Sequence, residues 1–270
     1  MSYNNFKATI VSAKIQHELY KECTLVNGCT TEFEGEAKQG GTVKINIAGR
    51  PTIKDYTGAA IDAAEEVTAN TTLLQIDQAN YFNFKIKDID KAMMTGNLFD
   101  AQTEEAKQGL AEKMDAYVGT MAKNAGKIIA STQITSAADA VAKLEAALIQ
   151  LRKNDVGRKT QVFADVPWWF YYLVLERAID LDTNNSSLVK EGVLKQYKDV
   201  YLRPTNMLYN DNTDDYIMVR TKKAIGFASG LDEVEAYRPE SDFSDALKGL
   251  NVYGAKVIRP KELVTIKVHE

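Results

Sequence analysis

The segment TTLLQIDQANYFNFKIKD, residues 71–88, alternates apolar and polar side chains over most of its length. A period of two is typical of β-strands, because successive side chains point to opposite faces of a sheet. The apolar residues that share one parity are Leu74, Ile76, Phe82, Phe84 and Ile86. Because the pattern is interrupted at Ala79-Asn80, the segment predicts two strands with a kink or tight turn between them.

Upstream, GGTVKINIAG (residues 40–49) repeats the alternation after two glycines, which predicts another strand. Between this strand and residue 71 lies a polar, acidic stretch that contains Pro51 and Asp55. We therefore expect residues 40–75 to leave the body of the protein and return to it as an extended loop.

From Asp100 the apolar period lengthens to three and four residues, which predicts one face of an amphipathic helix. The residues on this face are Ala106, Leu110, Met114, Tyr117, Val118, Met121, Ala125 and Ile128. We expect the helix to run from Thr103 to about Ala130, with Asp100 or Thr103 as its cap. At 1.5 Å per residue it would be roughly 40 Å long, which is unusual in a chain of this size.

A second helix is predicted from Ser136, with Asp139 in the capping-box position and Gly157 at its end. TQVFADV (160–166) predicts a strand, and Pro167 begins a third, very apolar helix. Further strands are expected near residues 198–209, 215–221, 250–258 and 262–268. This mixture of interleaved helices and strands indicates the α+β class.

The third helix opens with five consecutive aromatic residues, Trp168, Trp169, Phe170, Tyr171 and Tyr172. Such a cluster can stack on bases or sugars. On a helix, however, these five side chains cover every side, which favours burial in a core or an interface.

The composition is that of an ordinary globular protein and does not favour a dedicated nucleic-acid binder. The 270 residues include 33 Lys plus Arg against 37 Asp plus Glu, a net charge of −4. Nucleic-acid binders usually carry a basic excess that neutralises phosphates. The longest apolar run, residues 166–175, is about half of the roughly 20 residues that a membrane-spanning helix needs. We expect an intracellular protein whose two cysteines, Cys23 and Cys29, are reduced thiols, with a disulfide as the alternative.

Most catalytic signatures are missing from the sequence, among them the phosphate-binding loop, the dinucleotide-binding glycine pattern and the zinc-protease helix. The two histidines, His17 and His269, lie near opposite ends. We therefore expect no enzyme and assign no catalytic, cofactor-binding or metal-binding residue.

Two acidic patterns leave alternatives open. Asp88 and Asp90 could hold a divalent cation, although a carboxylate at that place more simply caps a turn. DLDTNNSSLVKE (180–191) places Asp180, Asp182, Asn184 and Glu191 at EF-hand positions 1, 3, 5 and 12. Asn185 replaces the usual Gly there and Ser187 an apolar anchor, so a polar surface loop is the alternative.

Five stretches, taken in order, resemble the major capsid proteins of tailed phages, the Hong Kong 97-type fold. GGTVKINIAG resembles the outgoing strand of that family's extended loop, and LLQIDQANYFNFKIKDID its return. The helix from Thr103 resembles the spine helix, and TQVFADVPWWFYYL the entry into the axial domain. FSDALKGLNVYGAKVIRPKELVTIKV (243–268) is similar to the C-terminal strand pair.

The resemblance implies a structural protein that builds icosahedral shells from hexamers and pentamers, without a cofactor. It implies an N-terminal arm (1–39), an extended loop (40–75), a peripheral domain with the spine helix (76–135 and 243–270) and an axial domain (136–242). Its partners would be copies of itself, packaged DNA without sequence-specific binding, and possible scaffolding, portal and decoration proteins. Assembly would take place in the host cytoplasm. The alternatives are an encapsulin-like nanocompartment shell and a carboxylate-based enzyme or calcium-binding protein.

Overall fold

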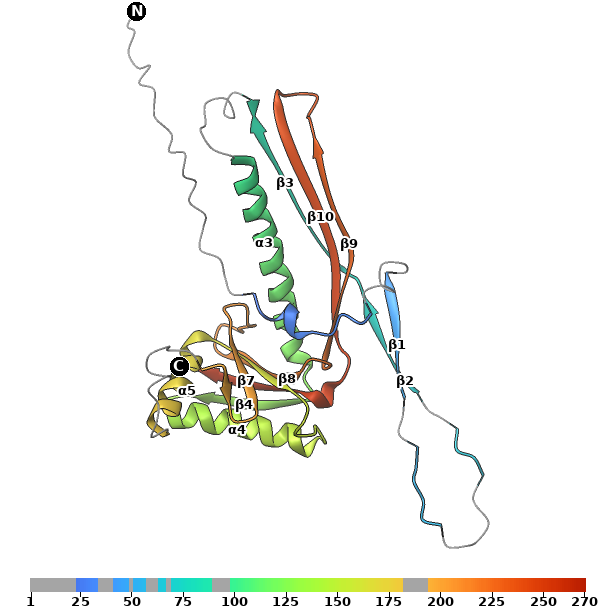
Figure 1. Ribbon diagram of the computed structural model, residues 1–270, viewed down its shortest axis with the longest axis vertical. Coiled ribbons are helices and arrows are strands. Elements are labelled where there is room, and N and C mark those ends of the chain that lie inside the picture. The colour runs from blue at the N-terminus through green and yellow to red at the C-terminus, as the bar shows by residue number, and fades with distance from the viewer. Residues whose placement is uncertain are drawn as a thin grey trace, which may run out of the picture.

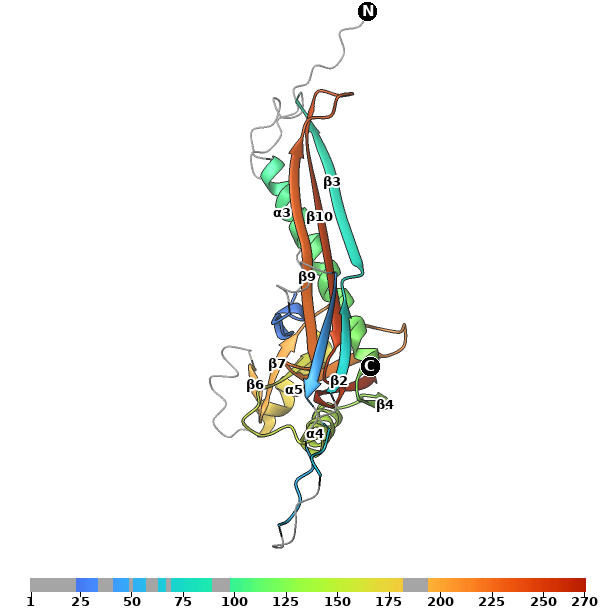
Figure 2. The same ribbon diagram turned by 90° about the vertical axis from the view of Figure 1, so that its right-hand side faces the viewer.

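The computed structural model describes residues 23–33, 41–48, 51–56, 63–66, 69–88, 98–181 and 194–270. The molecule is elongated: a long sheet with a parallel helix rises from a broader base, and a ribbon projects beside that base (Figures 1 and 2). The described strands form sheets of two, three and six strands.

The ribbon is an antiparallel pair of β1 (Thr42–Ala48) and β2 (Ala69–Gln75). Its root is packed, because Val43 lies opposite Leu74 and both are buried, as is Ile45. Beyond the pair, the described segments 51–56 and 63–66 extend away from the body (Figure 1). This hairpin agrees with the extended loop predicted for residues 40–75.

The three-stranded sheet contains β3 (Gln78–Lys87), β10 (Ser244–Val257) and β9 (Ile225–Tyr237), in the order β3-β10-β9. Helix α3 (Leu98–Thr120) runs alongside it (Figure 2). The predicted apolar parity of β3 is confirmed: Ile86 is buried, Phe82 and Phe84 are half-buried, and the rings of Phe84 and Phe99 are 5.7 Å apart. A base-stacking role for this strand is therefore not supported.

The break between β2 and β3 lies at Ile76-Asp77, and not at Ala79-Asn80 as predicted. The chain changes partner at this point. Gln75 is the last residue to pair with β1, and Gln78 already pairs with Tyr253 of β10.

Helix α3 is shorter at its C-terminal end than predicted. It ends at Thr120 and is followed by the 3-10 turn η2 (Met121–Asn124) and by β4 (Lys127–Gln133). The Gly126 N–H donates to the Pro260 carbonyl oxygen at 3.0 Å, and a Cβ on Gly126 would lie 2.3 Å from that oxygen. Because this N–H bonds Pro260 and not the carbonyl four residues earlier, the chain is not helical here, and Ile128 pairs in a sheet instead.

The predicted caps of α3 also differ from the structure. The helix begins at Leu98, so Asp100 and Thr103 lie inside it. The Thr103 hydroxyl donates to the Phe99 carbonyl oxygen at 2.7 Å, which is a bond within the helix and not an N-cap.

The six-stranded sheet has the order β4-β11-β8-β5-β7-β6. Its other strands are β5 (Val162–Val166), β6 (Gln196–Tyr197), β7 (Val200–Pro204), β8 (Asp215–Thr221) and β11 (Leu263–His269). The sheet is mixed, because β11 runs parallel to β4 and β5 runs parallel to β7, whereas the other described pairs are antiparallel.

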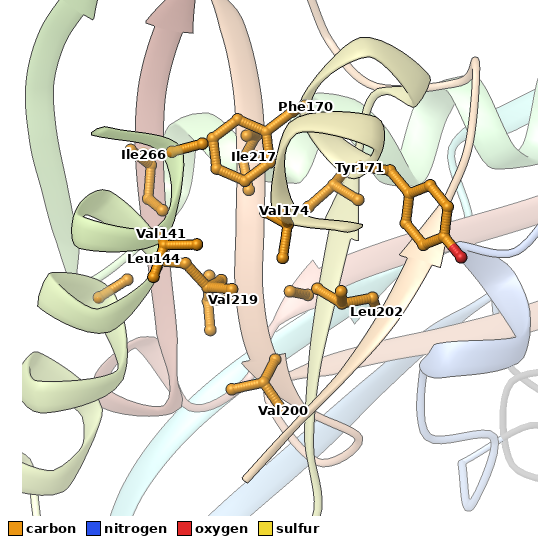
Figure 3. Close-up of a cluster of buried hydrophobic side chains, with 14 of the residues drawn as sticks. Val141, Leu144, Phe170, Tyr171, Val174, Val200, Leu202, Ile217, Val219 and Ile266 are labelled. Atoms are coloured by element: carbon orange, nitrogen blue, oxygen red, sulfur yellow. The ribbon is translucent and has the colours of Figure 1, made fainter. Parts of the chain in front are cut away.

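Helices α4 (Ala137–Lys153) and α5 (Trp168–Leu181) cover one face of this sheet. Figure 3 shows their apolar side chains against those of the strands, as with Leu144 and Phe170 against Val219 and Ile266. The end of α3 packs on the opposite face, where Val118 joins Met218 and Leu263. The base is therefore a sheet covered on both sides.

The predicted start of α4 is confirmed. The Asp139 N–H donates to Ser136 Oγ at 3.2 Å, and Ser136 Oγ donates to the Asp139 carboxylate at 2.7 Å. Its end is not at Gly157 as predicted. Asn154 is the C-cap, and Asp155 adopts the left-handed conformation with a φ of 65°. Asp tolerates that conformation better than most residues, so the chain turns before the glycine.

The aromatic cluster on α5 is buried on one side only. Phe170 and Tyr171 are buried, Trp168 and Trp169 are half-buried, and Tyr172 is 57% exposed. The prediction of burial therefore holds for two of the five side chains within this chain.

Three strands lie in a different sheet from most of the predicted domain to which each was assigned. Strand β9 belongs to the three-stranded sheet, although residues 136–242 were assigned to the axial domain. Strands β4 and β11 belong to the six-stranded sheet, although both were assigned to the peripheral domain. The reason is pairing: β9 forms a hairpin with β10, and β11 lies between β4 and β8.

Candidate functional site

The loop at the end of the β1–β2 ribbon exposes every described side chain. Its two sides are joined, because Thr52 donates its N–H and its hydroxyl to the Glu65 carboxylate at 3.0 and 3.2 Å. Ile53 is 81% exposed and Tyr56 is 75% exposed. Large apolar side chains that add nothing to their own core are characteristic of contact surfaces. We take this loop as the first candidate site, because its exposed apolar side chains suit a contact surface.

A buried polar junction connects the N-terminal segment to both parts of the body. The Arg220 guanidinium of β8 donates to Asp165 Oδ2 at 2.8 Å, to the Gly28 carbonyl at 2.6 Å and to the Leu25 carbonyl at 2.8 Å. Arg220 and Asp165 are both fully buried. Although burial alone would lower the pKa of Arg220, the Asp165 carboxylate raises it above its usual value.

Two further side chains complete this junction. Arg203 of β7 lies 2.5 Å from Asp165 Oδ1. Asp115 of α3 accepts the N–H groups of Leu25 and Val26 at 2.9 and 3.0 Å. Burial raises the pKa of Asp115, and these hydrogen bonds oppose that rise. The 3-10 turn η1 (Val26–Gly28) is thus held by α3 on one side and by the six-stranded sheet on the other.

Sequence reasoning did not identify the junction, although the signal was present. Arg220 follows DYIMV, and Asp165 lies within VFADV, so each charge lies next to a run of apolar residues in a strand. Charged residues are rarely buried unless they are paired, so two of them in core strands suggest an ion pair.

The predicted acidic sites are not brought together as a metal centre. Asp88 forms an ion pair with Arg238, and its N–H donates to the Phe243 carbonyl at 3.0 Å, so it belongs to the tip of the three-stranded sheet. Asp90 lies outside the described residues, as do residues 182–193 and the side chain of Asp180. Among the residues that the structure describes, no group of three or more His, Cys, Asp or Glu could hold a metal ion.

The remaining candidates have structural contacts. His269 Nδ1 lies 2.8 Å from the Asp214 carboxylate, and His17 is outside the described residues. Cys23 and Cys29 are reduced thiols, and Cys29 is buried, which raises its pKa. No described helix combines the length and the apolar character that a membrane crossing requires.

The strongest likenesses to known proteins are structural. No protein-family model and no curated protein matches the sequence. A structure from Mycobacterium phage Che8 matches with a TM-score of 0.84 and 26% identity over 98% of each chain. The capsid structure of cyanophage P-SCSP1u matches with a TM-score of 0.80 and 15% identity over 98% of this chain and 94% of that chain.

A virus-like particle from Pyrococcus furiosus is more distant. Its TM-score is 0.53 at 12% identity, over 84% of this chain and 86% of that chain. The phage structures therefore match more of the chain and match it more closely, and they do so along its whole length. In its fold, this chain belongs with the major capsid proteins of tailed bacteriophages, the Hong Kong 97 type.

Proposed function

We propose that this chain is the major capsid protein of a tailed bacteriophage, and that hexamers and pentamers of it form an icosahedral shell around double-stranded DNA. The observation that carries the proposal is the match to the Che8 phage structure over 98% of both chains. The exposed ribbon loop supports it, because Ile53 and Tyr56 need a neighbour to become buried.

Within this proposal, each of the two larger sheets corresponds to one domain. The three-stranded sheet with α3 is the peripheral domain, and the six-stranded sheet with α4 and α5 is the axial domain. Residues 1–39 are the N-terminal arm and 40–75 the extended loop. Since the net charge is −4, we expect the packaged DNA to be confined rather than bound in a sequence-specific way. Scaffolding, portal and decoration proteins are the expected partners, and assembly takes place in the host cytoplasm.

The protein is proposed to be structural and not an enzyme. A cellular nanocompartment is the second candidate, because the Pyrococcus furiosus particle shares the fold at lower similarity. Electron microscopy of the purified full-length chain tests the shell directly. We expect closed particles or rings of five and six subunits, and a strict monomer under every salt and protein concentration would contradict the proposal.

Nuclease protection separates the two kinds of shell. Particles from infected cells should contain genome-length double-stranded DNA that survives nuclease treatment. Particles that enclose a protein cargo and no DNA would support the nanocompartment instead.

A further inference from the structure

The chain passes repeatedly between two parts of the molecule, the stem and the base. The stem is the three-stranded sheet with α3, and the base is the six-stranded sheet with α4 and α5 (Figure 1). In the part of the chain that the structure describes, three crossings connect them. The first crossing is residues 121–126 between α3 and β4, the second is residues 222–224 between β8 and β9, and the third is residues 258–262 between β10 and β11.

Backbone hydrogen bonds join the three crossings to one another. The Gly126 N–H donates to the Pro260 carbonyl oxygen at 3.0 Å, which links the first crossing to the third. The N–H groups of Ile258 and Arg259 both donate to the Ala224 carbonyl oxygen, at 2.9 and 3.2 Å, which links the third crossing to the second. The third crossing is therefore bonded to both of the others, and the three form one bundle.

Two glycines bring the end of α3 and the first crossing close to other backbone. A Cβ on Gly126 would lie 2.3 Å from the Pro260 carbonyl oxygen and 3.2 Å from the Lys261 nitrogen. A Cβ on Gly119 would lie 2.6 Å from the carbonyl oxygen of Met207, which belongs to the base. Backbone cannot rotate aside as a flexible side chain can. The separation of stem and base at this end of α3 therefore depends on the absence of a side chain at both positions.

The bundle of crossings lies at the surface and has room to shift. Its exposed residues are Gly126, Lys222, Lys223, Arg259, Pro260 and Lys261. A hollow of about 560 Å³ adjoins the third crossing, beside the chain that follows α4. Stem and base also share buried side chains, among them Val118, Met218 and Leu263. A shift within the bundle therefore tilts the two parts against each other without separating them.

We propose that this bundle of crossings sets the angle between stem and base, and that Gly126 is the residue that determines the size of the assembled shell. Whether contacts between identical copies close, and into what, depends on the rotation from one copy to the next. A tilt between stem and base changes that rotation, and it is repeated in every subunit. The proposal rests on the assembly function proposed above and adds the position that governs the diameter.

Gly126→Ala tests the proposal, because it places a methyl group where the first and third crossings leave no room. The crossings must move apart, so particles of this variant should differ in mean diameter from the wild type by more than the spread of the wild-type diameters. Electron microscopy measures both. Gly109→Ala is the matched control: it makes the same chemical change within α3, where a Cβ meets nothing within 4 Å, and it should give particles of wild-type diameter.

Pro260→Gly tests the same bundle without a steric clash. The Pro260 side chain is exposed, and a glycine carbonyl can still accept the Gly126 N–H, so the variant should fold. It replaces a residue of fixed φ by the most permissive one, which loosens the third crossing. We expect particles whose diameters spread more widely than those of the wild type. This variant decides the matter if Gly126→Ala yields no particles.

The angle between α3 and β11, measured in reconstructions of the particles, shows whether a changed diameter comes from the bundle. Gly126→Ala should change the angle and the diameter together. Wild-type diameters for this variant, or a changed diameter at the wild-type angle, would overturn the proposal. So would a Pro260→Gly distribution no wider than that of the wild type, or a control whose diameter shifts as much as that of Gly126→Ala. If the wild type itself forms no particles, it is the proposed function that fails.

Discussion

At the scale of single residues, Arg220 is the side chain that depends most on its surroundings. A buried guanidinium is tolerated only when its charge is paired and its N–H groups are bonded. Here Asp165 and the carbonyls of Leu25 and Gly28 meet both needs. The same contacts hold the turn η1 against the sheet, so one side chain stabilises two parts of the chain.

Arg220→Met should therefore unfold the protein at a much lower urea concentration. It removes the donor from the Gly28 carbonyl and one of the donors from the Leu25 carbonyl, and it leaves Asp165 with Arg203 alone. Breaking a buried pair in this way costs about 3–5 kcal/mol. Arg158→Met is the matched control, because the Arg158 side chain is 86% exposed and its loss should change stability by less than about 0.5 kcal/mol. Equal unfolding midpoints for the two variants would contradict the role assigned to the junction.

The Asp139 carboxylate should make the stability of α4 depend on pH. Its pKa is lowered, chiefly by the hydrogen bond from Ser136 and then by that from Thr135. A lowered folded-state pKa means that its contribution is present above the ordinary value of 3.8 and is lost as the pH falls through the folded-state pKa. Asp139→Asn should thus lower the unfolding midpoint at pH 7 and lose this effect in acid. A difference between wild type and variant that stays constant down to pH 3 would count against the capping box.

At the scale of elements, α3 offers two glycines with opposite surroundings. A Cβ on Gly109 would meet nothing within 4 Å, whereas one on Gly119 would lie 2.6 Å from the Met207 carbonyl oxygen. Gly109→Ala should raise the melting temperature, because Gly inside a helix costs about 0.5–1 kcal/mol relative to Ala. Gly119→Ala should lower it, because backbone must move to admit the methyl group. If both substitutions stabilise the protein, α3 does not pack against residue 207 as described.

The elements that could be predicted from the sequence are those whose pattern is local. The alternation at Val43, Ile45 and Ile47 identified β1, and the pair Ser136 and Asp139 identified the start of α4. The end of α3 could not be predicted, because Ile128 continues the helical spacing and only its pairing with Thr265 makes it a strand. Gly126 was the available signal, but its meaning depends on Pro260, more than a hundred residues away.

The candidate sites, too, could be predicted only where their sequence pattern is local. The ribbon loop was predictable, because two alternating strands enclose a polar stretch in the sequence. At the junction around Arg220, the two charges in apolar strands suggested an ion pair between Arg220 and Asp165. Its contacts with η1, β7 and α3 could not be predicted, because they form only in the folded chain.

At the scale of the whole molecule, the loop should matter to assembly and not to folding. Replacing residues 51–66 by a short Gly-Ser linker removes only exposed described side chains and the bonds between Thr52 and Glu65. We expect a subunit with an unchanged melting temperature that forms no stable shells, measured by calorimetry and electron microscopy. A Gly-Ser loop of the original length should also fail to form shells, because we expect the contact between subunits to depend on the side chains of the loop and not on its length. An unfolded deletion variant would show that the loop stabilises its own subunit.

The place of β11 in the six-stranded sheet has a consequence for synthesis on the ribosome. The strand is the last of the sequence, yet it pairs with β4 on one side and with β8 on the other. Until it emerges, β4 has no neighbour within this sheet and β8 shows an open edge, the kind of edge that recruits other chains. A polypeptide that stops early therefore lacks the strand that joins the two parts of the sheet. Only subunits translated through residue 269 can therefore complete the six-stranded sheet.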